Sequence, residues 1–122
     1  MSKKLLIIDD DVDFAKAIAG ILENRNYRVE IASDGLQAIE KSNEGNVDLI
    51  LLDICMPFFS GFWFCDAFKQ RPQTKDIPVI VISGLTDAKD IQKAYNVGAC
   101  AYMKKPFEAA ELIKVIEEHL AA

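Results

Sequence analysis

The chain has 122 residues, the usual length of one domain, so we expect a single domain over residues 1–122. Its hydrophobic content of 51% and charged content of 27% are ordinary for a globular protein, and its net charge of -5 disfavours binding of nucleic acid or acidic membranes by this domain. The apolar runs are too short for a membrane span, and the sequence shows no secretory signal. The three cysteines form no C-x-x-C pair, which argues against structural zinc. We therefore expect a cytoplasmic protein with reduced thiols.

Five segments are predicted to be strands. Leu5–Ile8, Val47–Leu52 and Val79–Ile82 are almost continuous apolar runs, which suit central strands of a parallel sheet that is covered on both faces. Arg28–Ile31 alternates between polar and apolar residues, so we expect an edge strand with one wetter face. Ala99–Met103 is the fifth candidate.

Amphipathic segments with apolar residues at helical spacing follow each predicted strand. Strand and helix therefore alternate five times, which predicts an α/β fold with a parallel sheet between two layers of helices. The first segment follows the N-cap Asp11 and has Val12, Phe14, Ile18, Ile21 and Leu22 on one face, and the second contains Leu36 and Ile39. The third runs from Phe62 to Phe68. The fourth contains Ile91, Ala94 and Tyr95 and ends at Gly98, and the fifth contains Leu112, Ile113, Ile116 and Leu120.

Polar residues follow four of the predicted strands at their carboxyl ends, which is where open parallel sheets bind ligands. Three carboxylates at this edge repel each other unless a cation lies between them, and Mg²⁺ accepts both carboxylate and phosphate oxygens. A lysine and a hydroxyl are suitable further ligands for a phosphoryl group. Any one of these residues alone is more often a helix cap than a functional group, but the set predicts a site for a divalent cation and a phosphoryl group: Asp9, Asp10, Asp53, Ser83 and Lys105.

Four short motifs, in this order and at these spacings, resemble the receiver domains of two-component response regulators, the CheY-like family. They are Ile7–Asp11, Leu52–Pro57 with Gly61, Val81–Gly84 and Lys104–Phe107, and the resemblance extends over nearly the whole chain. It implies a doubly wound (βα)5 flavodoxin-like three-layer sandwich whose parallel five-stranded sheet has the order 2-1-3-4-5.

The function that the resemblance implies is phosphorelay signal transduction. A sensor histidine kinase or a histidine phosphotransfer protein would donate a phosphoryl group, and the phosphorylated domain would bind a downstream protein target. The domain would catalyse its own phosphotransfer and slow autodephosphorylation, and it would not otherwise be an enzyme. The sequence ends at Ala122, so, unless it was cut from a longer protein, we expect the output to be a change in protein binding.

The resemblance also assigns the site residues. Asp53 would be the phosphoacceptor and form an acyl phosphate, which is nucleophilic catalysis by a carboxylate. Asp10, Asp53 and the main-chain carbonyl of Cys55 would bind Mg²⁺ (or Mn²⁺) directly, and Asp9 would act through a water. Lys105 would pair with Asp53 before the reaction and with a phosphate oxygen after it.

The switch that the resemblance implies involves Ser83 and Tyr102. Ser83 would move to hydrogen-bond the new phosphate, and Tyr102 would turn inward into the vacated space, which changes a docking surface. Pro106 matches a family proline that follows a cis peptide bond. Gly61 matches the family glycine at the start of the third helix.

The segment Phe58–Phe64 departs from the family pattern because it contains five aromatic residues in seven positions. Such a segment cannot place every ring in one core. We expect Phe58 and Trp63 to be exposed and to form an anchor for a partner or for a second copy of the chain in a homodimer; packing over Cys55 and Met56 is the alternative. The residues expected on the core face are Phe62 and Phe59, continued by Cys65 and Ala67 or Phe68.

Other classes of protein fit less of the sequence. Haloacid-dehalogenase phosphatases share an Asp-x-Asp motif with Asp9–Asp11, but Asp13 stands where they carry Thr or Val and no late acidic motif follows Lys105. The same aspartates have the spacing of a calcium loop, yet Phe14 occupies the required glycine position. A flavin-binding domain would need a phosphate-binding loop that three aspartates would repel. The main alternative is an interaction module that keeps the fold without accepting phosphate.

Overall fold

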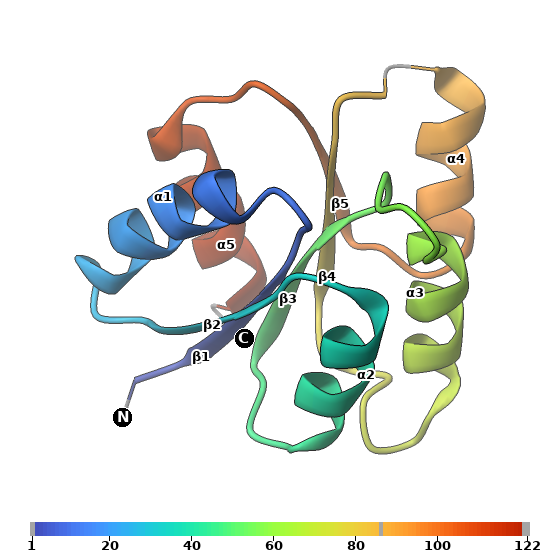
Figure 1. The fold of residues 1–122 in the computed structure, drawn as a ribbon, viewed down its shortest axis with the longest axis horizontal. Helices are drawn as coiled ribbons and strands as arrows, with labels where there is room; N and C mark the ends of the chain where they lie inside the picture. The colour runs from blue at the N-terminus through green and yellow to red at the C-terminus, as the bar shows by residue number, and fades with distance from the viewer. Residues whose placement is uncertain (1, 86, 121–122) are drawn as a thin grey trace.

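A computed structural model of the chain describes residues 2–85 and 87–120. Strands and helices alternate along it, as the sequence predicts (Figure 1). In these described ranges, no helix combines the length and the apolar character needed to cross a membrane. The elements are β1 (Lys4–Ile8), α1 (Val12–Glu23), β2 (Arg28–Ala32), α2 (Gly35–Asn43), β3 (Leu49–Asp53), α3 (Gly61–Gln70), β4 (Val79–Ser83), α4 (Ala88–Asn96), β5 (Ala101–Lys104) and α5 (Ala109–Leu120).

The five strands form one parallel sheet in the order β2-β1-β3-β4-β5, so the predicted fold class and strand order are confirmed. Helices α1 and α5 lie on one face of the sheet, and α2, α3 and α4 lie on the other (Figure 1). Each face has its own apolar cluster, because side chains of a strand point alternately to the two faces. The central strands β1, β3 and β4 are buried on both sides, as their continuous apolar runs predict.

The strand register brings the carboxyl ends of β1, β3, β4 and β5 to one edge. Ile8 lies opposite Leu52, so the next residues, Asp9 and Asp53, come level with each other. In the same way Ser83, the last residue of β4, lies opposite Lys104, the last residue of β5. The strands β3, β4 and β5 each end one residue later than predicted, and the polar residues at this edge are therefore held partly by the sheet itself.

Side-chain caps begin the helices α1 and α3, and the predicted N-cap Asp11 is one of them. Asp11 accepts a hydrogen bond from the Phe14 N–H at 3.1 Å, and Ser60 accepts one from the Trp63 N–H at 3.1 Å. Beyond the end of α4, Gly98 has a φ of 108°, a conformation that glycine adopts without strain.

Some helix faces differ from the prediction. In α2, Leu36 and Ile39 are exposed, and the small residues Ala38 and Ser42 face the sheet instead. These two residues lie one helical turn apart, and their small side chains let the helix approach the sheet closely. Val12, which was predicted to share a face with Ile18 and Leu22 in α1, is also exposed, as is Tyr95 in α4.

The buried face of α3 differs from the expected face in part. Cys65 and Phe68 are buried as predicted, and Phe62 and Phe59 are partly buried and pack against the same cluster, but Phe64, which was not predicted on this face, is buried as well. The rings of Phe64 and Phe68 stack with centroids 5.6 Å apart. Gly61 packs closely against Ile54 at the start of α3, because a Cβ there would lie 2.8 Å from the Ile54 Cα.

Candidate functional site

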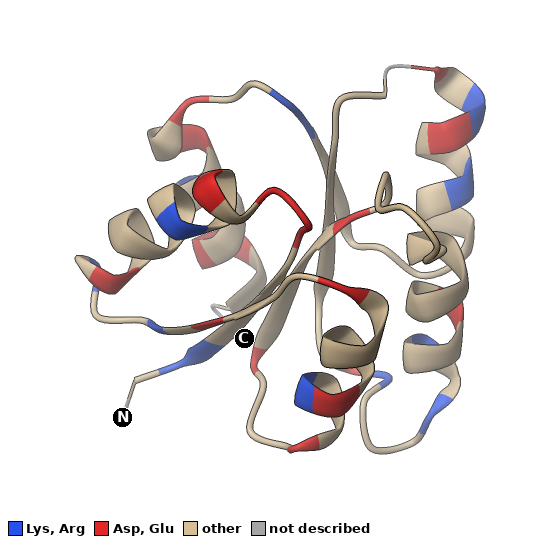
Figure 2. Ribbon diagram, viewed as in Figure 1, with Lys and Arg blue, Asp and Glu red and all other residues tan. Residues whose placement is uncertain are grey.

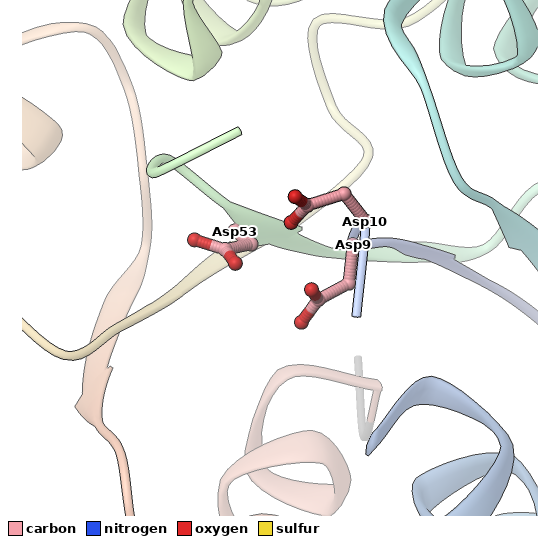
Figure 3. Close-up of side chains that lie close together, drawn as sticks. All are labelled: Asp9, Asp10 and Asp53. Carbon is pink, nitrogen blue, oxygen red and sulfur yellow. The ribbon is translucent and has the colours of Figure 1, made fainter. Parts of the chain in front are cut away.

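Three carboxylates meet at the carboxyl edge of the sheet. Asp9 and Asp10 follow β1, and Asp53 ends β3; each contributes an oxygen atom, and these oxygens all lie within 4.8 Å of one another (Figure 3). Figure 2 shows acidic segments in red where β1 and β3 end. Asp9 and Asp53 are only 2% and 6% exposed, whereas Asp10 is exposed to solvent. The structure thus brings together the three carboxylates that the sequence predicted.

One lysine connects two of these carboxylates. The Lys105 Nζ lies 2.9 Å from Asp9 Oδ2 and 3.3 Å from Asp53 Oδ2. The other oxygens accept main-chain hydrogen bonds: Asp53 Oδ1 from the Cys55 N–H at 2.8 Å, and Asp9 Oδ1 from the Asp11 N–H at 2.9 Å. Both buried carboxylates are therefore fixed in orientation at each oxygen.

The charges of this cluster do not balance. Burial raises the pKa of Asp9, and the negative charge of Asp53 adds to this effect, although the hydrogen bond from Lys105 opposes it. Burial alone would lower the pKa of Lys105, but its hydrogen bond to Asp9 and the charges of both carboxylates raise the pKa above its ordinary value. Lys105 is thus a cation at neutral pH, and it contacts two of the three carboxylates in the cluster. Oxygen donors with an excess of negative charge are the set that Mg²⁺ prefers.

Ser83 and Tyr102 lie on neighbouring strands and are linked through Leu85. Ser83 is fully buried, and its Oγ accepts a hydrogen bond from the Leu85 N–H at 3.0 Å and lies 3.4 Å from the Cys55 Sγ. Tyr102 is half-buried, and its hydroxyl donates to the Leu85 carbonyl at 2.8 Å. Sequence reasoning missed this role of Leu85, because main-chain groups leave no signal in side-chain motifs.

The loop after β5 carries Lys105 to the site. The Lys105 N–H donates to the Ser83 carbonyl at 2.8 Å, which extends the pairing of β4 and β5 by one residue. The peptide bond between Lys105 and Pro106 is cis, as the family resemblance implies. Sequence reasoning also missed a neighbour of the lysine, since the Phe14 ring lies beneath its ammonium group.

Phe58 and Trp63 lie outside this cluster of polar residues. Phe58 is fully exposed in the loop before α3 and has a φ of 58°, and Trp63 is 59% exposed. Trp63 lines an apolar groove between α2 and α3, together with Ile39 and Arg71. The predicted exposure of both aromatic residues is confirmed.

Comparisons with known proteins agree with this fold and this arrangement. The family model for the response regulator receiver domain matches residues 5–117. The chain is 35% identical over 121 residues to a probable transcriptional regulator, ycf29, of Pyropia yezoensis, an alignment that covers 99% of this chain and 54% of the relative. It is 36% identical over 117 residues to the response regulator ArlR of Staphylococcus saprophyticus, covering 96% of this chain and 52% of that protein. The chain thus spans about half the length of these curated relatives.

Solved structures give the same result. The chemotaxis protein CheY4 of Vibrio cholerae superimposes with a TM-score of 0.92 at 30% sequence identity, over 98% of this chain and 100% of that chain. The chain therefore belongs to the receiver domains of two-component response regulators. Domains of this family are phosphoacceptor switches of phosphorelay signalling: they bind Mg²⁺, are phosphorylated on an aspartate and interact with histidine kinases.

Proposed function

We propose that this domain accepts a phosphoryl group on Asp53 and that the phosphorylated domain presents an altered docking surface to a downstream protein target. A sensor histidine kinase or a histidine phosphotransfer protein would be the donor. The observation that carries the proposal is the environment of Asp53: the Cys55 N–H holds one carboxylate oxygen, and the other faces the Lys105 ammonium group.

In the reaction, a carboxylate oxygen of Asp53 attacks the phosphorus atom of the donor. A new O–P bond forms while the P–N bond of phosphohistidine breaks, and the imidazole nitrogen leaves with the electron pair. With a small donor such as acetyl phosphate, the bond that breaks is P–O and acetate leaves. Lys105 lies close enough to Asp53 to pair with the oxygens of the transferred group.

Asp10, Asp53 and the main-chain carbonyl of Cys55 are the residues that would hold Mg²⁺ (or Mn²⁺), with Asp9 acting through a water. The closeness of the three carboxylate oxygens supports this assignment, and so does their negative charge, which the contacts of Lys105 with Asp9 and Asp53 offset only in part. When bound, the ion would offset the negative charge of the carboxylates and of the incoming phosphoryl group.

The switch would run through Ser83 and Tyr102. The Ser83 hydroxyl accepts a hydrogen bond from the Leu85 N–H in this structure. A movement of this hydroxyl toward the phosphate would break that hydrogen bond. The Leu85 carbonyl in turn accepts the hydrogen bond of Tyr102, so a change at Ser83 reaches the side chain of Tyr102 on β5. We assign Tyr102 to signalling, and we assign Ser83 both to the catalytic site, with Asp53 and Lys105, and to the switch.

The partners of the domain are expected to be proteins. A net charge of -5 makes contact with nucleic acid by this domain unfavourable, and no membrane contact is proposed. The exposed rings of Phe58 and Trp63 are candidate contacts for a partner or for a second copy in a homodimer. We further propose that residues 1–122 act as one cytoplasmic receiver domain.

The experiment that tests the acceptor is labelling with radioactive acetyl phosphate in the presence of Mg²⁺. Asp53→Asn should abolish the label because the nucleophilic oxygen is lost. Asp66→Asn is the matched control, since Asp66 is exposed on α3 and bonded to Gln70, and it should be labelled like the wild type. Stoichiometric, acid-labile label on Asp53→Asn would contradict the assignment.

A second titration separates the proposal from its main alternative, an interaction module that ignores phosphate. Beryllofluoride mimics a phosphoryl group on an aspartate, and with Mg²⁺ it should change the NMR spectrum of the domain around Asp53, Ser83 and Tyr102. Neither beryllofluoride nor Mg²⁺ alone should do so to the same extent. A spectrum that the combination leaves unchanged would favour the alternative.

A further inference from the structure

The ammonium group of Lys105 lies between two carboxylates and an aromatic ring. Its Nζ contacts Asp9 and Asp53, and it also lies 4.2 Å from the centroid of the Phe14 ring. A cation at this distance over a ring face is attracted by the negative face of the ring quadrupole. The site has therefore both hydrogen-bonding and aromatic partners for the same lysine.

Two elements of the fold hold the Phe14 ring in this position. Phe14 belongs to the first turn of α1, and its N–H donates to the N-cap Asp11. Its ring also meets the ring of Phe107 edge to face, with centroids 5.9 Å apart and an angle of 83° between the planes. Phe107 follows Lys105 by two residues, so the loop that carries the lysine also carries the ring that supports Phe14.

The lysine needs such support because of its chemistry. Its four-carbon chain is flexible and its ammonium group is strongly hydrated, so it does not keep one orientation unaided. Only 23% of the Lys105 side chain is exposed, and its ammonium group lies over the Phe14 ring. The ring thus limits both the rotamers of the lysine and the access of water to it.

We propose that Phe14 is a positioning residue for phosphoryl transfer: its ring holds the Lys105 ammonium group against Asp9 and Asp53, oriented toward the phosphoryl group that Asp53 accepts. This inference rests on the proposed function, since it concerns the same lysine and the same reaction. It adds a residue from α1 to a site whose other members lie at the ends of strands or directly after them.

The test is Phe14→Leu, which keeps an apolar side chain against Phe107 and removes the aromatic ring. At saturating Mg²⁺, the rate of labelling by acetyl phosphate should fall by about 2- to 10-fold, the range expected for a cation–π contact that is partly shielded from water. The affinity for Mg²⁺ should not change, because all three carboxylates remain. An unchanged rate in a folded Phe14→Leu variant would overturn the proposal.

A second readout reports on the lysine directly and needs no phosphorylation. In the wild type, the ring current of Phe14 should move the NMR signals of the Lys105 ε-methylene protons upfield, and Phe14→Leu should return them to the usual lysine position. Wild-type protons already at that usual position would overturn the proposal even if labelling were normal. Label that persists on Asp53→Asn would instead contradict the proposed function, so the two failures can be told apart.

Two controls separate positioning from a general effect on the fold. Phe62 is a matched residue, because it is partly buried and the Lys93 Nζ lies 4.6 Å from its centroid, away from the site; Phe62→Leu should leave the labelling rate unchanged. In a Lys105→Met background, Phe14→Leu should have no further effect on the rate. An equal loss in that background would mean that the ring acts through the fold and not through the lysine.

If Phe14→Leu does not fold, fluorinated phenylalanine at position 14 gives the same test. Successive fluorine atoms weaken the negative face of the ring while its shape is nearly kept. The labelling rate should then fall with each added fluorine. A rate that does not depend on fluorination would overturn the proposal.

Discussion

The end of β3 and the helix that follows it bury very different side chains. Asp53 is 6% exposed among carboxylates, and Phe64 is 4% exposed among other aromatic rings. Burial of Phe64 stabilises the fold, by about 1.5–3 kcal/mol for a side chain of this kind. Burial beside Asp53 has the opposite effect, because it raises the pKa of Asp9 and so disfavours the charged form that the site uses. The aromatic cluster thus raises the free energy of unfolding, and the burial of charged carboxylates at the site lowers it.

The largest expected effect is on the aromatic side of this comparison. Phe64→Ala should lower the free energy of unfolding by about 3–5 kcal/mol, because it removes a ring that contacts both Phe59 and Phe68. Urea denaturation measures this loss. Any fraction that remains folded should still be labelled by acetyl phosphate. A loss below about 1 kcal/mol would contradict the role of Phe64 as a core residue.

On the carboxylate side, Asp10→Ala should weaken Mg²⁺ binding at least about tenfold, or about 1.4 kcal/mol, because one of few direct carboxylate ligands is lost. Its effect on unfolding without Mg²⁺ should be small, since Asp10 is exposed. Isothermal titration calorimetry measures the affinity. Asp13→Ala is the control, because it removes an exposed negative charge nearby in α1 without removing a member of the carboxylate cluster. Equal affinities for wild type and Asp10→Ala would exclude Asp10 as a ligand.

A more modest effect should follow from neutralising Asp9. Its pKa is raised in the folded protein, so its contribution to stability is present below the unfolded pKa of about 3.9 and is lost as the pH rises through the folded pKa. With EDTA present at pH 7, Asp9→Asn should therefore raise the free energy of unfolding relative to the wild type. The advantage should shrink toward pH 4, as wild-type Asp9 takes up a proton. Urea denaturation at several pH values measures the difference in the free energy of unfolding between Asp9→Asn and the wild type. A difference that grows on acidification would contradict the raised pKa of Asp9.

The smallest expected effect on stability is that of Phe58→Ser combined with Trp63→Ala. Both rings are exposed, so the free energy of unfolding should change by less than about 1 kcal/mol, in contrast to Phe64→Ala. If the rings anchor a partner or a second copy, self-association measured by sedimentation should fall at the same time. A loss of several kcal/mol would mean that the rings belong to the core and not to a contact surface.

Much of the carboxylate region could be predicted from the sequence, and less of the aromatic region. Strand ends carry Asp9, Asp10 and Asp53 to one edge of any parallel sheet with this order, so the cluster follows from topology. The face of α3 does not follow in this way, because a run of aromatic residues has no clear helical period. The helix begins at the Ser60 cap, where Gly61 closely approaches Ile54.

Two other features lay beyond sequence reasoning for related reasons. The helix α2 has only two large apolar residues, which are too few to define its buried face. The small residues Ala38 and Ser42 face the sheet instead. The contact between Phe14 and Lys105 joins residues near opposite ends of the chain. Neither local periodicity nor a motif carries information about such a pair.

The strand order also has a consequence for the synthesis of the chain. Because β1 pairs with both β2 and β3, the first 53 residues already contain three neighbouring strands and all three carboxylates. A ribosome delivers the N-terminal part of a protein first, and β4, β5 and Lys105 emerge later in the order in which they join the sheet. We therefore expect the acidic cluster to meet cations from solution before its own lysine has been made, so that the ammonium group of Lys105 is the last charge to be added to the site.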